Sequence, residues 1–362
     1  MATLDWWRGF LAFVVFLSHI VQIIWFPVFG DQGVFQDMIS CAANYAVVFF
    51  FVISGMLISY SALNVCEGDQ FHWKKFLINR IARIYPSLIF VILLCAVLVI
   101  IFPLFNNQER TIHRLITDQY LARDIFTVKW QGFIKSFFLI GSGLHSINLA
   151  IWSLAIEWWT YMSALFFFLA LVSNKNTLMR ILYIFLSVIM LCLPCVTYGL
   201  SGVFYIAVWY IGLLYTLHYR NAPGPFMMLV GSCLAGLLLL VYFYGLSAFN
   251  INKANNIVYG FLQIFISVLF INVSLKYSGK FLFQHMASFS YTLYIIHSPL
   301  ILFVFAIFHS SIKANYFYLI LESITLIILI VLFSKKAAKY TEDKNKYKLF
   351  IQNYLGLITL SK

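Results

Sequence analysis

The stretch GFLAFVVFLSHIVQIIWFPVFG, residues 9–30, contains no Asp, Glu, Lys or Arg. About 20 apolar residues in a helix cross the roughly 30 Å hydrocarbon core of a bilayer, so this stretch predicts a membrane span. No basic region precedes it, and no convincing small-residue cleavage site follows. These features favour a permanent first span over a cleaved signal peptide.

The composition extends this interpretation to the whole chain. Of 362 residues, 63% are hydrophobic and 10% are charged, whereas a soluble domain has about 45–50% apolar and about 25% charged residues. We predict one integral-membrane domain over residues 1–334 and a basic cytoplasmic tail over residues 335–362. The net charge of +12 is typical of cytoplasmic loops that collect Lys and Arg, and does not indicate a nucleic-acid partner.

The fold class predicted is an all-α, polytopic membrane protein with about ten transmembrane helices. The expected spans are 9–29, 40–62, 84–105, 147–172, 179–199, 203–218, 226–247, 257–275, 287–308 and 316–334. With the N-terminus inside, the inner segments hold 17 Lys and Arg residues and the outer segments hold 7. This bias predicts that both termini are cytoplasmic.

The segment 106–146 is the longest break between predicted spans, and a connection of this length is usually functional or flexible. We expect part of it to lie on, or dip into, the outer face of the membrane. Gly141-Ser142-Gly143 is a candidate break in a re-entrant helix. The tail is expected near anionic lipid head groups.

Arg8 and His19 are eleven residues apart. On a helix this is about three turns, so both lie on one face, roughly 16 Å apart along the axis. An ionisable residue inside a bilayer is costly and is read first as functional. His19 suits a general base; the alternative is a neutral imidazole bonded to a neighbouring helix. Arg8 suits a phosphate; the alternative is a topology charge that reaches the interface.

Other polar residues in or near the predicted spans allow the same two kinds of interpretation. Arg80 and Arg83 lie three apart and either share one anion or mark two cytoplasmic charges. Glu157 lies among aromatic residues and either orients or stabilises an imidazole such as His19, or makes a helix-packing hydrogen bond. Ser54, before Gly55, either contacts a donor or allows close helix packing.

Tyr291, Tyr294 and His297 recur every three residues and form a polar stripe on the ninth predicted span. Pro299 follows shortly after, and a proline inside a span frees backbone groups and often shapes a cavity. His297 therefore either lines an acceptor path or bonds between helices.

Several separated motifs together resemble the membrane acyltransferase 3 family. The matching stretches, in chain order, are LDWWRG at 4–9 with His19, FFFVISGMLI at 49–58, RIARIYP at 80–86, WSLAIE at 152–157 and SYTLYIIHSP at 290–299. The resemblance runs from about residue 4 to 334 and depends on the order and spacing of the motifs, since any one of them alone is weak.

The resemblance implies an enzyme that moves an acyl group from cytoplasmic acyl-CoA to a cell-surface carbohydrate, with acetyl-CoA as the expected co-substrate and no metal. The predicted roles are catalytic for His19 and Glu157; donor-binding for Arg8, Arg80, Arg83 and Ser54; and acceptor path for His297, Tyr291, Tyr294 and Trp152. His19 would act either as a general base or through an acyl-histidine intermediate.

The acceptor is expected to be an envelope sugar such as O-antigen, capsule or a lipid-linked glycan, and the location a bacterial inner membrane. A transporter or flippase that uses buried His and Glu as a proton relay is the main rival. The paired interrupted helices that such transporters carry in corresponding halves are not visible in the sequence. A membrane glycan polymerase is a third possibility, but it would usually have larger outer loops.

Overall fold

The computed structural model describes residues 2–29, 33–67, 70–105, 111–113, 119–141, 143–172, 177–221, 282–312 and 316–355. The chain divides into two compact units. Unit 1 contains Met1–Val47, Arg83–Trp152 and Gly279–Asp343, and unit 2 contains Val48–Ala82, Ser153–Ser278 and Lys344–Lys362. Each unit is described by itself below.

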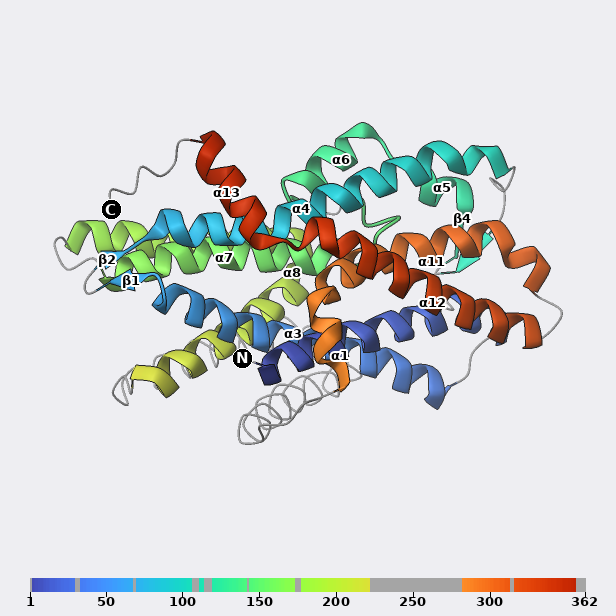
Figure 1. Ribbon diagram of the computed structural model, residues 1–362, viewed down its shortest axis with the longest axis horizontal. Helices are drawn as coiled ribbons and strands as arrows, with labels where there is room; N and C mark the ends of the chain where they lie inside the picture. Colours follow the sequence, from blue (N-terminus) through green and yellow to red (C-terminus); the bar gives the residue numbers. More distant parts are fainter. Residues whose placement is uncertain are drawn as a thin grey trace. The chain divides into compact units, whose positions relative to one another are not determined.

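Helices make up almost all of the described secondary structure (Figure 1). The long helices are α1 (Ala2–Ile20), α3 (Val34–Leu63), α4 (Trp73–Ile101), α7 (Ile151–Val172), α8 (Thr177–Asn221), α11 (Ser290–Ile312) and α12 (Tyr316–Thr341). The shorter ones are η1 (Val21–Trp25), α2 (Phe26–Phe29), η2 (Phe102–Phe105), α5 (Ala122–Phe126), α6 (Trp130–Phe137), η3 (Leu282–Ser288) and α13 (Lys344–Leu355).

Seven of the described helices are long and apolar enough to cross a membrane. They cover eight of the ten predicted spans, because α8 contains a kink at Gly199 (φ 57°, ψ −138°) between the spans predicted at 179–199 and 203–218. The predicted spans 226–247 and 257–275 lie outside the described residues. The chain is thus an all-α membrane protein, while the count of ten and the orientation of the termini stay predictions.

Two helices extend beyond the spans predicted for them. Helix α4 begins at Trp73, ahead of the span predicted from residue 84, so Pro86 lies inside the helix. Helix α12 continues to Thr341, beyond the end predicted at residue 334. Two short antiparallel strand pairs join the helices: β1 (Cys66–Glu67) with β2 (Gln70–Phe71), and β3 (Thr111–His113) with β4 (Gln119–Leu121).

In unit 1, α11 packs against both α1 and α12, and Figure 1 shows α11 and α12 running side by side. Helix α1 continues directly into the π-helical turn η1, which begins two residues after His19. Such turns insert one residue into a helix and occur often at functional sites. Trp25 at the end of η1 donates a hydrogen bond from Nε1 to Ser323 Oγ on α12 (2.8 Å), which fixes the turn against the bundle.

In unit 2, the backbones of α3 and the second half of α8 approach closely at two glycines. A Cβ at Gly55 would overlap the Trp209 carbonyl oxygen, and one at Gly212 would overlap the Val52 carbonyl oxygen. Small residues at such crossings are typical of membrane helix pairs. This close contact brings Ser54, the residue before Gly55, against Trp209 and places it in the polar network described below.

Candidate active site

His19 and His297 form a direct pair within unit 1. The distance from His19 Nδ1 to His297 Nε2 is 2.7 Å, and the two rings stack with centroids 5.0 Å apart and 28° between their planes. His297 on α11 is fully buried, whereas His19 on α1 is partly buried. Phe16, one turn before His19, meets the His297 ring edge-on at 5.8 Å. Two histidines 278 residues apart thus share one hydrogen bond.

The hydrogen bonds around the pair assign its protons. His297 Nδ1 lies 3.0 Å from the Leu293 carbonyl oxygen, which can only accept, so this nitrogen carries a proton and donates. In a neutral imidazole the other nitrogen then accepts, so His297 Nε2 accepts from His19 Nδ1–H. The lone pair of neutral His19 is left on Nε2. The pair therefore presents one basic nitrogen, held in one tautomer by a second imidazole and a backbone carbonyl.

Pro299 shapes the backbone beside this pair. A proline inside a helix removes the hydrogen bond to the carbonyl four residues earlier, here that of Ile295. The fully buried Asn148 donates from Nδ2 to this same carbonyl oxygen at 2.7 Å. The next residue, Leu149, donates its backbone N–H to Ser298 Oγ at 3.1 Å. The segment before α7 is thereby fastened to α11 on both sides of His297.

Glu157 is the centre of a second network, within unit 2. Its Oε1 accepts a hydrogen bond from Ser54 Oγ at 2.7 Å and another from the Tyr161 hydroxyl. Trp209 Nε1 donates to Ser54 Oγ at 3.1 Å, so α3, α7 and α8 all contribute to the network. Tyr161 is one helical turn after Glu157 on α7. The two donors hold one carboxylate oxygen of Glu157 in place.

Arg80 joins the same network from α4. Its guanidinium carbon lies 5.7 Å from the centre of the Tyr161 ring and 5.6 Å from that of Phe76, and its Nη2 donates to Ser61 Oγ at 2.8 Å. Arg80 is 8% exposed. A buried guanidinium between two aromatic faces is oriented by cation–π attraction. Unit 2 thus brings together three predicted site residues, Ser54, Arg80 and Glu157.

A third group, in unit 1, surrounds the N-terminus of α11. Glu342 Oε1 accepts hydrogen bonds from the backbone N–H of Thr292 (2.9 Å) and from its Oγ1 (2.7 Å). The carboxylate therefore caps one of the N–H groups that a helix start leaves unpaired. Arg8 and Arg83 both act electrostatically on this carboxylate. Arg8 also forms an ion pair with Asp5 at 3.3 Å.

Sequence reasoning missed Glu342. It assigned this residue to the basic tail after residue 334, where its carboxylate had no predicted partner. The helical pattern that continues to Thr341 was the available signal, because it carries Glu342 to the end of a packed helix.

The remaining predicted residues lie on α11 and at the start of α7. Tyr291 is buried, and the Tyr294 ring lies 6.1 Å from that of His297. Trp152 is the second residue of α7 and is partly buried. Among the described residues, no group of three or more His, Cys, Asp or Glu side chains is arranged to hold a metal ion.

Comparison with known proteins bears on the family of the chain. A stretch of 190 residues is 30% identical to an uncharacterized protein of Haemophilus influenzae and covers 51% of this chain and 72% of that protein. No solved structure matches the chain. The family model described as an acyltransferase domain, Acyl_transf_3, matches residues 1–334. Because this match covers most of the 362 residues, the chain belongs to the membrane acyltransferase 3 family.

Proposed function

We propose that this membrane acyltransferase moves an acyl group, in the first instance acetyl, from cytoplasmic acyl-CoA to a hydroxyl of a bacterial envelope carbohydrate. The proposed acceptors are O-antigen, capsule and lipid-linked glycans, and the proposed location is the bacterial inner membrane. The observation that carries this proposal is the His19–His297 pair, since its assigned tautomer gives His19 Nε2 the lone pair that acyl transfer to a hydroxyl requires.

The proposed reaction uses His19 as a general base. Its Nε2 takes the proton of the acceptor hydroxyl as the oxygen attacks the thioester carbonyl. The acyl–oxygen bond forms, the acyl–sulfur bond breaks, and the proton passes from His19 to the leaving thiolate, giving free CoA thiol. His297 acts as the positioning residue for His19.

His297 also has an electrostatic role in this scheme. When His19 is protonated, its Nδ1–H donates to His297 Nε2 as a charge-assisted hydrogen bond, which is stronger than a neutral one. His297 thus orients His19 in the way that the third residue of a catalytic triad orients the base.

Three arginines are the proposed donor-binding residues. A guanidinium matches phosphate oxygens with two parallel hydrogen bonds, which suits the phosphates of CoA. Arg80 is oriented by the Tyr161 ring and by a hydrogen bond to Ser61. Arg8 and Arg83 both interact electrostatically with the Glu342 carboxylate. Within unit 2, we propose that Ser54 and Glu157 bind the donor beside Arg80, because Tyr161 joins Arg80 to the carboxylate. This proposal replaces the catalytic role predicted for Glu157.

The experiment that tests this function is transfer of label from radiolabelled acetyl-CoA into envelope glycan. Membranes with wild-type protein and with His19→Ala, expressed equally, are compared, and release of free CoA thiol is measured with and without acceptor. We expect acceptor-dependent thiol release and labelled glycan with the wild type alone. A proton-coupled transporter would release no thiol. Equal label with both proteins would remove His19 from the mechanism.

A further inference from the structure

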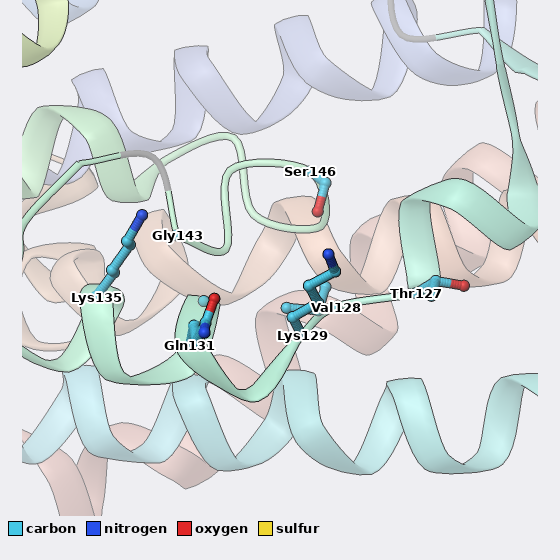
Figure 2. Close-up of a pocket in the computed structure, with 8 residues that line it drawn as sticks. Thr127, Val128, Lys129, Gln131, Lys135, Gly143 and Ser146 are labelled. Carbon is cyan, nitrogen blue, oxygen red and sulfur yellow. The ribbon is translucent and has the colours of Figure 1, made fainter.

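A polar cavity lies in the segment between α5 and α7, within unit 1. Its volume is about 230 Å³. The side chains and backbone that border it include Thr127, Lys129, Gln131, Lys135, Gly143 and Ser146 (Figure 2). We call it the lysine pocket. The family match assigns no function to this pocket. The roles predicted for the histidine and arginine residues do not involve it either.

Backbone contacts give the lysine pocket a fixed wall. A Cβ at Gly132 would lie 2.8 Å from the Gly143 carbonyl oxygen, and a Cβ at Gly143 would overlap the Gly132 carbonyl oxygen. Only glycine fits both positions without a shift of the backbone. The buried Ser136 Oγ accepts the N–H of Leu144 at 2.9 Å, which ties α6 to the loop that carries Gly143 and Ser146.

The chemistry of the lining selects an anionic, hydroxyl-rich ligand. Two ammonium groups, one amide and two hydroxyls border the cavity, and none of its lining residues is acidic. In Figure 2 the amino end of Lys129 points toward Ser146, while Lys135 extends from the other end of the pocket, with Gln131 between them. Ammonium groups bind phosphate and carboxylate oxygens by charge-assisted hydrogen bonds, and amide and hydroxyl groups match sugar hydroxyls.

A second face of α6 bears on where this pocket lies with respect to a bilayer. Trp130, Ile134 and Phe137 are 68%, 45% and 38% exposed and lie on one face of the helix, while Gln131 and Lys135 are one turn apart and border the pocket. A short helix with one apolar and one basic face is typical of the membrane interface. With this apolar face in the bilayer, the pocket would lie at the level of the head groups.

The same loop is connected to the histidine pair. Asn148 and Leu149 form hydrogen bonds with Ile295 and Ser298, which lie two residues before and one residue after His297. A ligand that orders the pocket therefore acts on a segment that is already fixed to the α11 turn that carries His297.

From the charge, the fixed wall and the apolar face of α6, we propose that the lysine pocket binds an acidic group, carboxylate or phosphate, of the acceptor glycan. This inference rests on the proposed function, because only that function supplies an acceptor glycan. It adds that the acceptor carries negative charge and that Lys129 and Lys135 recognise that charge.

The test is a binding measurement without acetyl-CoA, so it does not depend on catalysis. Full-length protein in phosphatidylcholine nanodiscs is titrated with a fluorescent tetrasaccharide of galacturonic acid and with its methyl ester, which has the same sugars but no charge. We expect the acid to bind about tenfold more tightly than the ester, and this difference to shrink with added salt.

Matched variants locate the binding. The double variant K129A/K135A is expected to abolish the preference for the acid, whereas K129R/K135R retains it because the positive charges remain. The control K335A/K336A removes two exposed lysines of α12 and is expected to retain the preference. Equal binding of acid and ester by the wild type, or an equal loss in K335A/K336A, would overturn the proposal.

Two further arms separate the alternatives. If phosphatidylglycerol in the nanodisc abolishes acid binding while phosphatidylcholine does not, the pocket is a lipid head-group site and the acceptor proposal is wrong. Charge-dependent binding by a protein that transfers no acetyl group would leave the pocket standing and refute the proposed function. Acetyl transfer without charge-dependent binding would refute the pocket alone.

Discussion

The histidine pair of unit 1 and the Glu157 network of unit 2 are both polar groups inside membrane helices, yet they are bonded differently. His297 uses both ring nitrogens in hydrogen bonds, and His19 uses only Nδ1 among the described contacts. In the Glu157 network, one carboxylate oxygen accepts hydrogen bonds from two hydroxyl groups. Ser54 Oγ in turn accepts a hydrogen bond from Trp209 Nε1. In the proposed mechanism the first group supplies the reacting nitrogen, whereas the second is bonded across three helices. Mutations should therefore affect catalysis most in the first and stability most in the second.

The largest effect is expected for His19. His19→Gln keeps a side chain of similar size but removes the base, so we expect acetyl transfer to fall about 10³-fold, within the usual range for general-base catalysis. The rate of CoA thiol release from purified protein measures it. Protein yield and acetyl-CoA binding serve as controls and should match the wild type. Full activity in a folded His19→Gln protein would exclude His19 as the base.

The second largest effect is expected for His297. Two variants of this residue test the proton positions assigned to the pair. Gln places an acceptor oxygen close to the position of Nε2, whereas Asn reproduces the Nδ1 side and offers nothing to His19. We expect His297→Asn to lower kcat about 10²-fold and His297→Gln about tenfold, with KM for acetyl-CoA nearly constant, since a positioning residue acts on the base and not on the donor. The opposite order of the two variants would contradict the assigned tautomer.

Removing a donor to Glu157 should cost stability first. Ser54→Ala leaves the carboxylate and Trp209 Nε1 each with one partner fewer, so we expect a loss of about 1–2 kcal/mol in the free energy of unfolding. Thermal unfolding in detergent measures this loss. Ser59→Ala is the matched control, because Ser59 bonds the Leu213 carbonyl on the same helix pair and lies outside the network.

Acetyl transfer in Ser54→Ala should fall about tenfold at most, less than for His297→Asn. A larger loss of activity with normal stability would place the reacting atoms in the Glu157 network and reverse the comparison.

The smallest effect is expected for Glu342. Glu342→Gln keeps an oxygen for Thr292 but removes the negative charge that faces Arg8 and Arg83. We expect KM for acetyl-CoA to fall about threefold at low salt, because the arginines then attract the donor phosphates without competition. The neighbouring Asp343→Asn is the charge-matched control. A higher KM in Glu342→Gln would show that the carboxylate orients the arginines for the donor.

The sequence alone predicted the helices, because long uncharged runs have few alternatives in a membrane. It singled out His19, Glu157 and His297, since ionisable residues inside such runs are rare. It did not pair His19 with His297, because this contact depends on how α1 is rotated against α11, which side-chain packing decides. Tyr161 lies one turn from Glu157 and was within reach of sequence reasoning, whereas Ser54 and Trp209 join only through the close approach at Gly55.

Pro299 shows the same limit from the backbone side. The proline predicts a freed carbonyl near His297, and the structure has one at Ile295. The hydrogen bond from Asn148 to this carbonyl could not be predicted, because 147 residues separate the two partners. Asn148 also lies in a loop, which has no periodic pattern that would place its side chain.

The separation of the two histidines also has a consequence for biosynthesis. His19 and His297 are 278 residues apart, and a ribosome adds about 5–20 residues per second. Roughly 14–56 s therefore pass between the synthesis of the base and that of the imidazole that orients it. A nascent or truncated chain that ends before α11 carries His19 without His297. If His19 is the base, we expect such a chain to turn over acetyl-CoA far more slowly than the complete protein, so that full activity would appear only when synthesis is nearly complete.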